Sequence, residues 1–167
     1  MTSYVENETE VELPFNIQEI VARIMETVME MEKCPYETTV NLLLTGNSGI
    51  REYNKAYRNI DCETDVLSFP NIHFEHEGDF TSVEENTADY FDPDTGELIL
   101  GDIILSVDRV LSQAKEYGHS ILREFAFLVA HSMFHMCGYD HVEEQKADIM
   151  EKKQEAVLTK LGIKRNI

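Results

Sequence analysis

The chain has no tryptophan, and only three cysteines and four prolines among its 167 residues. The cysteines, Cys34, Cys62 and Cys137, are odd in number and scattered, which favours free thiols in a reducing cytoplasm over a disulfide framework. No stretch approaches the ~20 apolar residues of a membrane-spanning helix, so we expect no membrane association. The first residues, MTSYVENETE, lack the apolar run of a signal peptide.

Positively charged residues are also scarce: the chain has 14 Lys and Arg but 32 Asp and Glu, which gives a net charge of −18. From Asn59 to Asp108 the chain contains no Lys or Arg, and most of the excess negative charge lies in that stretch. Arg51, Lys55 and Arg58 recur at i, i+4 and i+7 of a short predicted helix and should form one basic face. The charge distribution is therefore compatible with nucleic-acid binding at this basic face, but the long-range attraction of the whole protein for RNA should be weak.

Hydrophobic periodicity predicts a series of short elements. Runs rich in apolar and β-branched residues predict strands, and apolar residues at helical spacing predict helices. The expected strands are 3–13, 38–44, 65–69 and 98–106, and the expected helices are 15–33, 50–58, 107–117, 120–137 and 142–161. This order predicts an α+β fold, a single domain over residues 1–167, with a small mixed sheet of about four strands and helices packed on it.

Residues 71–97 are acidic, rich in Asn, Asp, Thr and Gly, and include the turn-like DPDTGE run at 92–97. A loop of this length is unusual in a compact domain, so the segment is either a functional flap or a tolerated insertion. We favour an insertion. His73 and His76 lie within it, and we expect them to be solvated and not to bind a metal.

The most informative stretch is FLVAHSMFHMCGYDH at 127–141. His131 and His135 lie four apart and share one helix face, and Ser120 can cap the N-terminus of that helix. Gly138 should end the helix, so that the returning chain brings His141 to the same point. Three imidazoles with a fourth position left open suit a catalytic Zn²⁺ site with one ion, although imidazoles also accept Ni²⁺ or Cu²⁺.

The spacing of these histidines matches the extended zinc-protease signature HExxHxxGxxH, with Ser132 in place of glutamate. That glutamate is the general base of peptide hydrolysis, so its absence removes the protease mechanism but keeps the metal ligands. Cys137 follows His135 by two residues, which turns its side chain about 160° away on a helix. We therefore do not expect Cys137 to bind the metal.

Three blocks of sequence resemble motifs of the YbeY family. They are HSMFHMCGYDH at 131–141, YRNIDCETDVLSFP at 57–70 and LGDIILS at 100–106. The tripeptide GHS at 118–120 also matches a sequence that is common in the family. The resemblance runs from about residue 40 to about residue 160. It implies a metal-dependent endoribonuclease, specific for single-stranded RNA, that matures the 3′ end of the small-subunit ribosomal RNA and acts in ribosome quality control. It also implies a small-subunit ribosomal protein and a ribosome-assembly GTPase as partners.

Arg58 is the predicted catalytic residue beyond the metal ligands His131, His135 and His141. It belongs to the matched YR motif, and a guanidinium can hold a phosphate and stabilise the charge that develops in phosphoryl transfer. The alternative is a structural ion pair with Asp61 or Asp65.

The sequence leaves the roles of several neighbouring side chains open. Asp65 and Asp102 could each bond a ligand histidine or cap a helix, and Asp140 could orient an imidazole or form an Asx turn. Ser68 and Phe69 could line the groove. We expect Tyr139 to serve packing and His119 to form a structural hydrogen bond.

A bound zinc ion would polarise a phosphodiester and acidify water. The nucleophile stays open between water and the RNA 2′-OH. Two rival functions are a zinc protease, against which Ser132 counts, and a non-catalytic ribosome-assembly factor, which the weak basic character favours.

Overall fold

The fold is built on a four-stranded mixed sheet in the order β1-β2-β4-β3, seen in a computed structural model that describes residues 1–164. The strands β1, β2 and β4 run parallel, and β3 pairs antiparallel with β4 at one edge. Their bounds are Thr2–Asn7 (β1), Thr38–Thr45 (β2), Val66–Pro70 (β3) and Leu98–Ser106 (β4). The predicted α+β fold with a small mixed sheet is confirmed.

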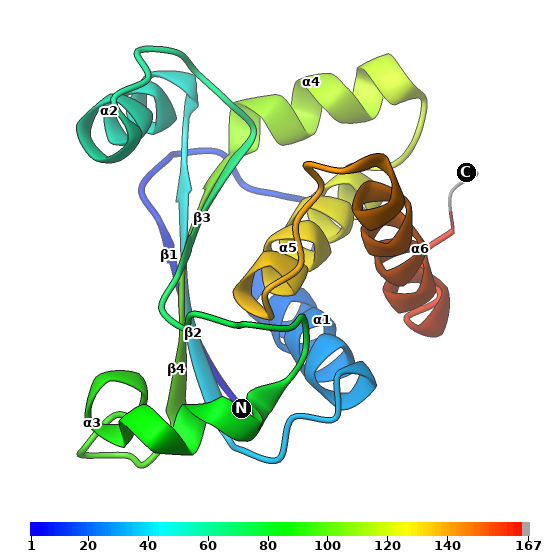
Figure 1. The fold of residues 1–167 in the computed structure, drawn as a ribbon. Helices are drawn as coiled ribbons and strands as arrows, with labels where there is room; N and C mark the ends of the chain where they lie inside the picture. The colour runs from blue at the N-terminus through cyan, green and yellow to red at the C-terminus, as the bar shows by residue number, and fades with distance from the viewer. Residues whose placement is uncertain (165–167) are drawn as a thin grey trace.

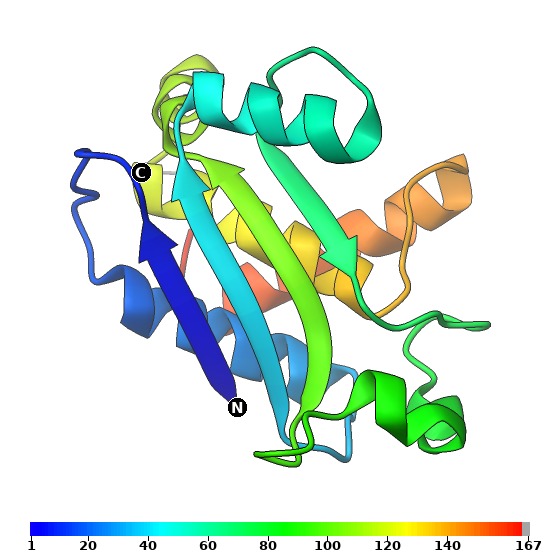
Figure 2. The same ribbon diagram turned by 90° about the vertical axis from the view of Figure 1, so that its left-hand side faces the viewer.

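The two faces of the sheet are covered unequally. Figure 1 shows α1 (Ile17–Met31), α5 (Ile121–Met136) and α6 (Glu144–Lys160) on one side of the sheet. Figure 2 looks onto the opposite face, where α2 (Asn47–Arg58) covers only one end of the strands. The helix α4 (Val107–Tyr117) follows β4 directly. No helix within residues 1–164 is long and apolar enough to cross a membrane.

The main core lies between the sheet and the helices α1 and α5. Helix α1 contributes Val21, Ile24 and Val28, which recur at helical spacing and are fully buried. Burial of each such aliphatic side chain is worth about 1.5–3 kcal/mol, so this stripe holds α1 against the sheet. Helix α5 is buried along most of its length, which fixes the backbone that carries His131 and His135.

Gly101 interrupts β4 with an irregularity that sets the position of β3. The register between β2 and β4 shifts there, so that Leu100 and Ile103 both belong to the main core. Gly101 has φ 142°, and a Cβ at this position would lie 2.2 Å from the backbone oxygen of Phe69 and 2.8 Å from Sδ of Met136. The missing side chain therefore allows β3 and α5 to approach β4 closely, as a glycine inside a strand often does.

The structure differs from the prediction in three segments. Helix α2 begins at Asn47, three residues before the predicted start at residue 50. The first strand ends at Asn7, not at residue 13, because the Asn7 side chain accepts hydrogen bonds from the backbone and hydroxyl of Thr9 and starts a turn.

Residues 71–97 are not the continuous loop that composition suggests. They contain a 3-10 helix, η1 (Phe80–Asn86), and a short helix, α3 (Thr87–Tyr90). Phe80 and Val83 are buried in the main core, and their apolar burial outweighs the polar composition around them. The backbone nitrogen of Gly78 also donates to the oxygen of Cys137 at 2.9 Å, which ties the segment to the end of α5.

Candidate metal centre

Helix α5 has well-defined ends, and they place the three histidines. Ser120 caps the start, as predicted, by accepting a hydrogen bond from the Arg123 backbone nitrogen at 3.1 Å. After Met136 the chain turns at Gly138, whose φ is 94°, and the Tyr139 nitrogen donates to the Phe134 oxygen at 3.0 Å. The turn reverses the chain and brings His141 back over the C-terminal end of α5.

The ring nitrogens of His131, His135 and His141 converge. One nitrogen from each ring lies within 4.8 Å of the others, and the Nε2 atoms of His131 and His135 are 3.1 Å apart. Ligands at about 2.1 Å from a tetrahedral zinc ion would be about 3.4 Å apart, so the spacing suits one ion. The three side chains are close enough to bind a metal.

The partners of the outer ring nitrogens indicate which tautomer His131 and His135 adopt. Nδ1 of His135 lies 2.8 Å from the backbone oxygen of Tyr139, which can only accept, so this nitrogen donates. Nδ1 of His131 lies 3.2 Å from Oε1 of Gln154 and donates in the same way. Both Nε2 atoms therefore carry lone pairs and face each other across 3.1 Å without a proton between them. Such a pair of acceptors fits a shared cation.

The electrostatics also keep these rings neutral and able to act as ligands. Burial lowers the pKa of His131 below its ordinary value. Burial, with a smaller contribution from His131, lowers the pKa of His135 to about 4. Metal binding to imidazole requires the neutral form, which both groups hold at neutral pH.

The centre opens on one side into a cavity of about 540 Å³. Within residues 1–164, the cluster of candidate ligands contains three imidazoles and neither a carboxylate nor a thiol. Cys137 is fully buried and its Sγ contacts Sδ of Met29 at 3.9 Å, so it points into the core. The lining of the cavity is Tyr57, Arg58, Thr64, Asp65, Val66, Ser68, Phe69, Pro70 and the three histidines, which includes both Ser68 and Phe69 as expected.

Arg58 lines this cavity from the C-terminal end of α2. Its two basic neighbours on α2, Arg51 and Lys55, both pair with Asp61, at 2.7 and 4.0 Å. Within the described residues Arg58 has no carboxylate within ion-pair distance, so the alternative pairing with Asp61 or Asp65 is not observed.

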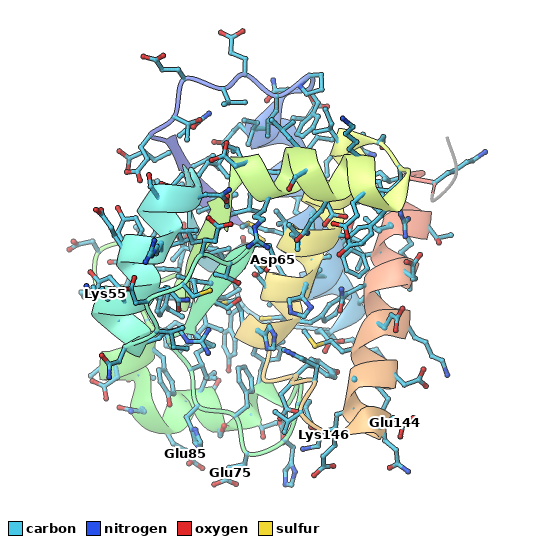
Figure 3. All side chains as sticks on the ribbon, turned by 90° about the horizontal axis from the view of Figure 1, so that it is seen from above. Lys55, Asp65, Glu75, Glu85, Glu144 and Lys146 are labelled. Carbon is cyan, nitrogen blue, oxygen red and sulfur yellow. The ribbon has the colours of Figure 1, made fainter. Side chains whose placement is uncertain are left out.

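Asp65 is the one carboxylate in the cavity wall formed by the described residues. Its Oδ1 accepts from the Val66 nitrogen at 2.8 Å and its Oδ2 from Gln113 at 3.5 Å. Figure 3 shows Asp65 near the centre of the molecule, whereas Lys55 lies on the outer side of α2. Asp65 precedes β3 and lies in the wall of the cavity that the three histidines line, but its carboxylate forms no hydrogen bond to any of them.

The other acids with open roles lie in different settings. Asp102 accepts from the Asn41 amide at 2.8 Å on β2, so it neither bonds a histidine nor caps a helix. Asp140 accepts from the Val142 nitrogen at 3.3 Å, which is the Asx-turn alternative.

Tyr139 and His119 behave as expected. The Tyr139 ring packs against Phe134 with centroids 5.7 Å apart, and Lys153 lies over it. His119 hydrogen-bonds Glu124 at 2.7 Å and is not part of the histidine cluster. His73 and His76 are exposed.

Ser132 is fully buried at the position where zinc proteases carry their glutamate, and it accepts a hydrogen bond from Ser68 at 2.9 Å. Gln154 is the contributor that sequence reasoning missed. It is buried on the apolar face of α6, between Met150 and Val157. A glutamine within the apolar stripe of α6 is the sequence feature that could have indicated this role.

The fold and the centre together define a class: an α+β protein with three histidines that lie close enough to bind a metal ion beside an open cavity. Comparison with known proteins narrows this class. A family model described as Endoribonuclease YbeY matches residues 4–162, and the chain belongs to the YbeY family.

Relatives agree with this assignment, and a solved structure shares the fold. A protein of Lachnoclostridium phytofermentans named Endoribonuclease YbeY is 53% identical over 99% of this chain and 100% of its own length. Proteins with the same name from Agathobacter rectalis and Acetivibrio thermocellus are 50% and 40% identical, each over 99% of this chain and 100% of the relative. The solution structure of TM1509 from Thermotoga maritima shares the fold, with a TM-score of 0.55, 21% identity and coverage of 96% of this chain and 91% of that one.

Proposed function

We propose that this protein is a zinc-dependent endoribonuclease that cleaves single-stranded RNA during ribosomal RNA maturation, including the 3′ end of the small-subunit RNA, in the cytoplasm. The observation that carries the proposal is the convergence of three imidazoles beside an arginine that has no carboxylate partner among residues 1–164, in one open cavity. Family membership supplies the substrate class, because the family model and the relatives are named as endoribonucleases.

His131, His135 and His141 would hold the metal, with the first two oriented by Gln154 and the Tyr139 carbonyl. Zinc fits an all-imidazole set with one open face, and when bound it would supply Lewis-acid polarisation of a phosphodiester oxygen and acidify a nearby water. Arg58 would bind the scissile phosphate and stabilise the negative charge that grows on it.

The cavity wall favours this chemistry over peptide hydrolysis. Ser132 is buried and bonded to Ser68, so it cannot replace the missing glutamate base. Asp65 is the one carboxylate in the cavity wall formed by the described residues, and the nucleophile would be either water or the RNA 2′-OH. We also propose a small-subunit ribosomal protein and an assembly GTPase as partners, since a net charge of −18 gives little long-range attraction for RNA alone.

The test measures cleavage of single-stranded RNA by the zinc-loaded protein and by two arginine variants. Arg58→Ala should lower kcat by about 10²- to 10³-fold, the typical effect of removing one group that stabilises transition-state charge. Arg23→Ala removes an arginine on the far helix α1 and should leave kcat unchanged. Equal activity of the Arg58→Ala and Arg23→Ala proteins would refute the role of Arg58, and a stable His131→Ala protein that still cleaves RNA would refute the proposed function.

A further inference from the structure

Three aromatic side chains form a cluster on the open face of the sheet, where β3 meets α2. Tyr53 and Tyr57, one turn apart on α2, stack with ring centroids 6.4 Å apart and an interplanar angle of 10°. Phe69 on β3 meets Tyr57 edge-on at 5.7 Å. Tyr57 is 69% exposed, so an aromatic surface is presented to solvent.

This cluster borders a second cavity, of about 380 Å³, on the face that Figure 2 shows. Tyr57 and Phe69 line both this cavity and the cavity of the metal centre, so the two share a wall. The lining is Asn41, Leu43, Tyr53, Tyr57, Phe69, Asp102, Ile103 and Ile104. It is mostly apolar and aromatic, and none of these residues is basic.

We propose that this second cavity binds one unpaired nucleobase of the RNA, next to the phosphate held at the metal centre. The inference rests on the proposed function. Aromatic rings bind single-stranded RNA by stacking on its bases, and an apolar cavity without cations suits a base and not a phosphate. The shared wall of Tyr57 and Phe69 gives the base and the phosphate a continuous path.

The occupancy of this cavity would also select against duplex RNA. A base that enters it must leave its stack and its pairing partner, which costs energy in a duplex and little in a single strand. The preference for single-stranded substrate would then arise at Tyr57 and not at the metal ligands.

The polar edge of the cavity adds a preference among bases. The Asn41 amide donates one N–H to Oδ1 of Asp102 at 2.8 Å, which leaves Oδ2 of Asp102 as an acceptor beside the second N–H and the Oδ1 of Asn41. The carboxylate of Asp102 accepts well from the N4 amino group of cytosine, whereas uracil offers only a carbonyl oxygen at that position. The cavity should therefore prefer cytosine to uracil.

The test compares binding of a short, fluorescein-labelled single-stranded RNA to wild type, Tyr57→Leu, Tyr57→Phe and Tyr117→Leu, with gels confirming that the RNA stays intact. Tyr57→Leu should raise Kd by about 5- to 100-fold, the range for loss of one base–aromatic stack. Tyr57→Phe keeps the ring and should bind like wild type. Tyr117 is a similarly exposed tyrosine at the end of α4, and Tyr117→Leu should change nothing.

A series of RNAs, each lacking the base at one position, shows whether a base fills the cavity. Loss of the base at one position should weaken binding to the wild-type protein and have no effect on binding to Tyr57→Leu. In parallel, Asp102→Asn should reduce the preference for oligocytidylate over oligouridylate. Equal abasic effects on both proteins would overturn the base site, as would a dimer that Tyr57→Leu dissociates without changing RNA affinity.

The outcomes separate this proposal from the proposed function. Cleavage of RNA with no dependence of binding on Tyr57 overturns only the base site. Binding that depends on Tyr57, without any cleavage, overturns only the endoribonuclease assignment and supports the base site.

Discussion

The hydroxyl of Ser68 on β3 donates to the hydroxyl of Ser132 on α5 at 2.9 Å. This bond joins the helix that carries two of the histidines to the strand that lines the cavity, and Ser132 is fully buried where it forms. The residue that replaces the protease glutamate therefore has a structural role, because it holds the strand against the helix.

Removal of either hydroxyl should weaken this connection. Ser132→Ala and Ser68→Ala should each lower the free energy of unfolding by about 1 kcal/mol, the usual worth of one hydrogen bond, measured by urea denaturation. The double variant should lose little more than either single variant, because both changes delete the same bond. Fully additive losses would show that the two serines act independently.

Gln154→Leu should weaken the metal site without unfolding the protein. The change removes the acceptor for Nδ1 of His131, and loss of such a partner typically costs about 10- to 100-fold in metal affinity. Competition with a chromophoric chelator measures this affinity. Gln154→Glu keeps an acceptor and should restore most of it, and Gln18→Leu on the exposed side of α1 is the control. Unchanged affinity in Gln154→Leu would rule out an orienting role.

Gly101→Ala tests the close approach of β3, β4 and α5. The added Cβ would meet the Phe69 backbone oxygen at 2.2 Å, and backbone cannot move aside easily. We expect a loss of about 3 kcal/mol or more in unfolding free energy, in the range of severe packing defects. Gly96→Ala is the matched control, since its φ is also positive but no atom lies within 4 Å, so only about 1 kcal/mol of backbone strain should appear.

Cys137 should make stability depend on alkaline pH. Burial raises the pKa of its thiol well above the ordinary value, so the folded protein keeps the proton that the unfolded chain loses above about pH 8.5. The native state then binds more protons than the unfolded state, and stability must fall as pH rises through that range.

Urea unfolding between about pH 7 and pH 10 measures this slope. Cys137→Ala should reduce the slope, although its stability at neutral pH will be lower because a cavity forms. Cys62→Ala removes an exposed thiol and should keep the wild-type slope. The same slope in Cys137→Ala and wild type would contradict the assignment.

Local sequence patterns predicted most of this architecture. Helix α4 and strand β4 begin and end where their periodicity does, because each is bounded by a clear cap or turn residue. The histidine cluster was predictable for the same reason: all three side chains lie within one helix and the turn after it, so short-range geometry brings them together.

Features that depend on long-range packing were not predictable in this way. Gln154 reaches His131 only because α6 packs on α5, and the spacing of residues within α6 does not reveal that contact. The cluster of Tyr53, Tyr57 and Phe69 likewise needs α2 to lie against β3. In residues 71–97, three buried apolar side chains, Ile72, Phe80 and Val83, hold a segment that is otherwise polar against the core.

The most direct test of the proposed metal-dependent endoribonuclease activity measures the rate of cleavage of single-stranded RNA in three states. These are the protein before chelation, the protein after removal of bound metal, and the metal-free protein after addition of an equimolar amount of zinc. Metal analysis should find one ion per chain, cleavage should cease when the ion is removed, and one equivalent of zinc should restore it. Undiminished cleavage by the metal-free protein, or full metal content in His131→Ala, would contradict the account.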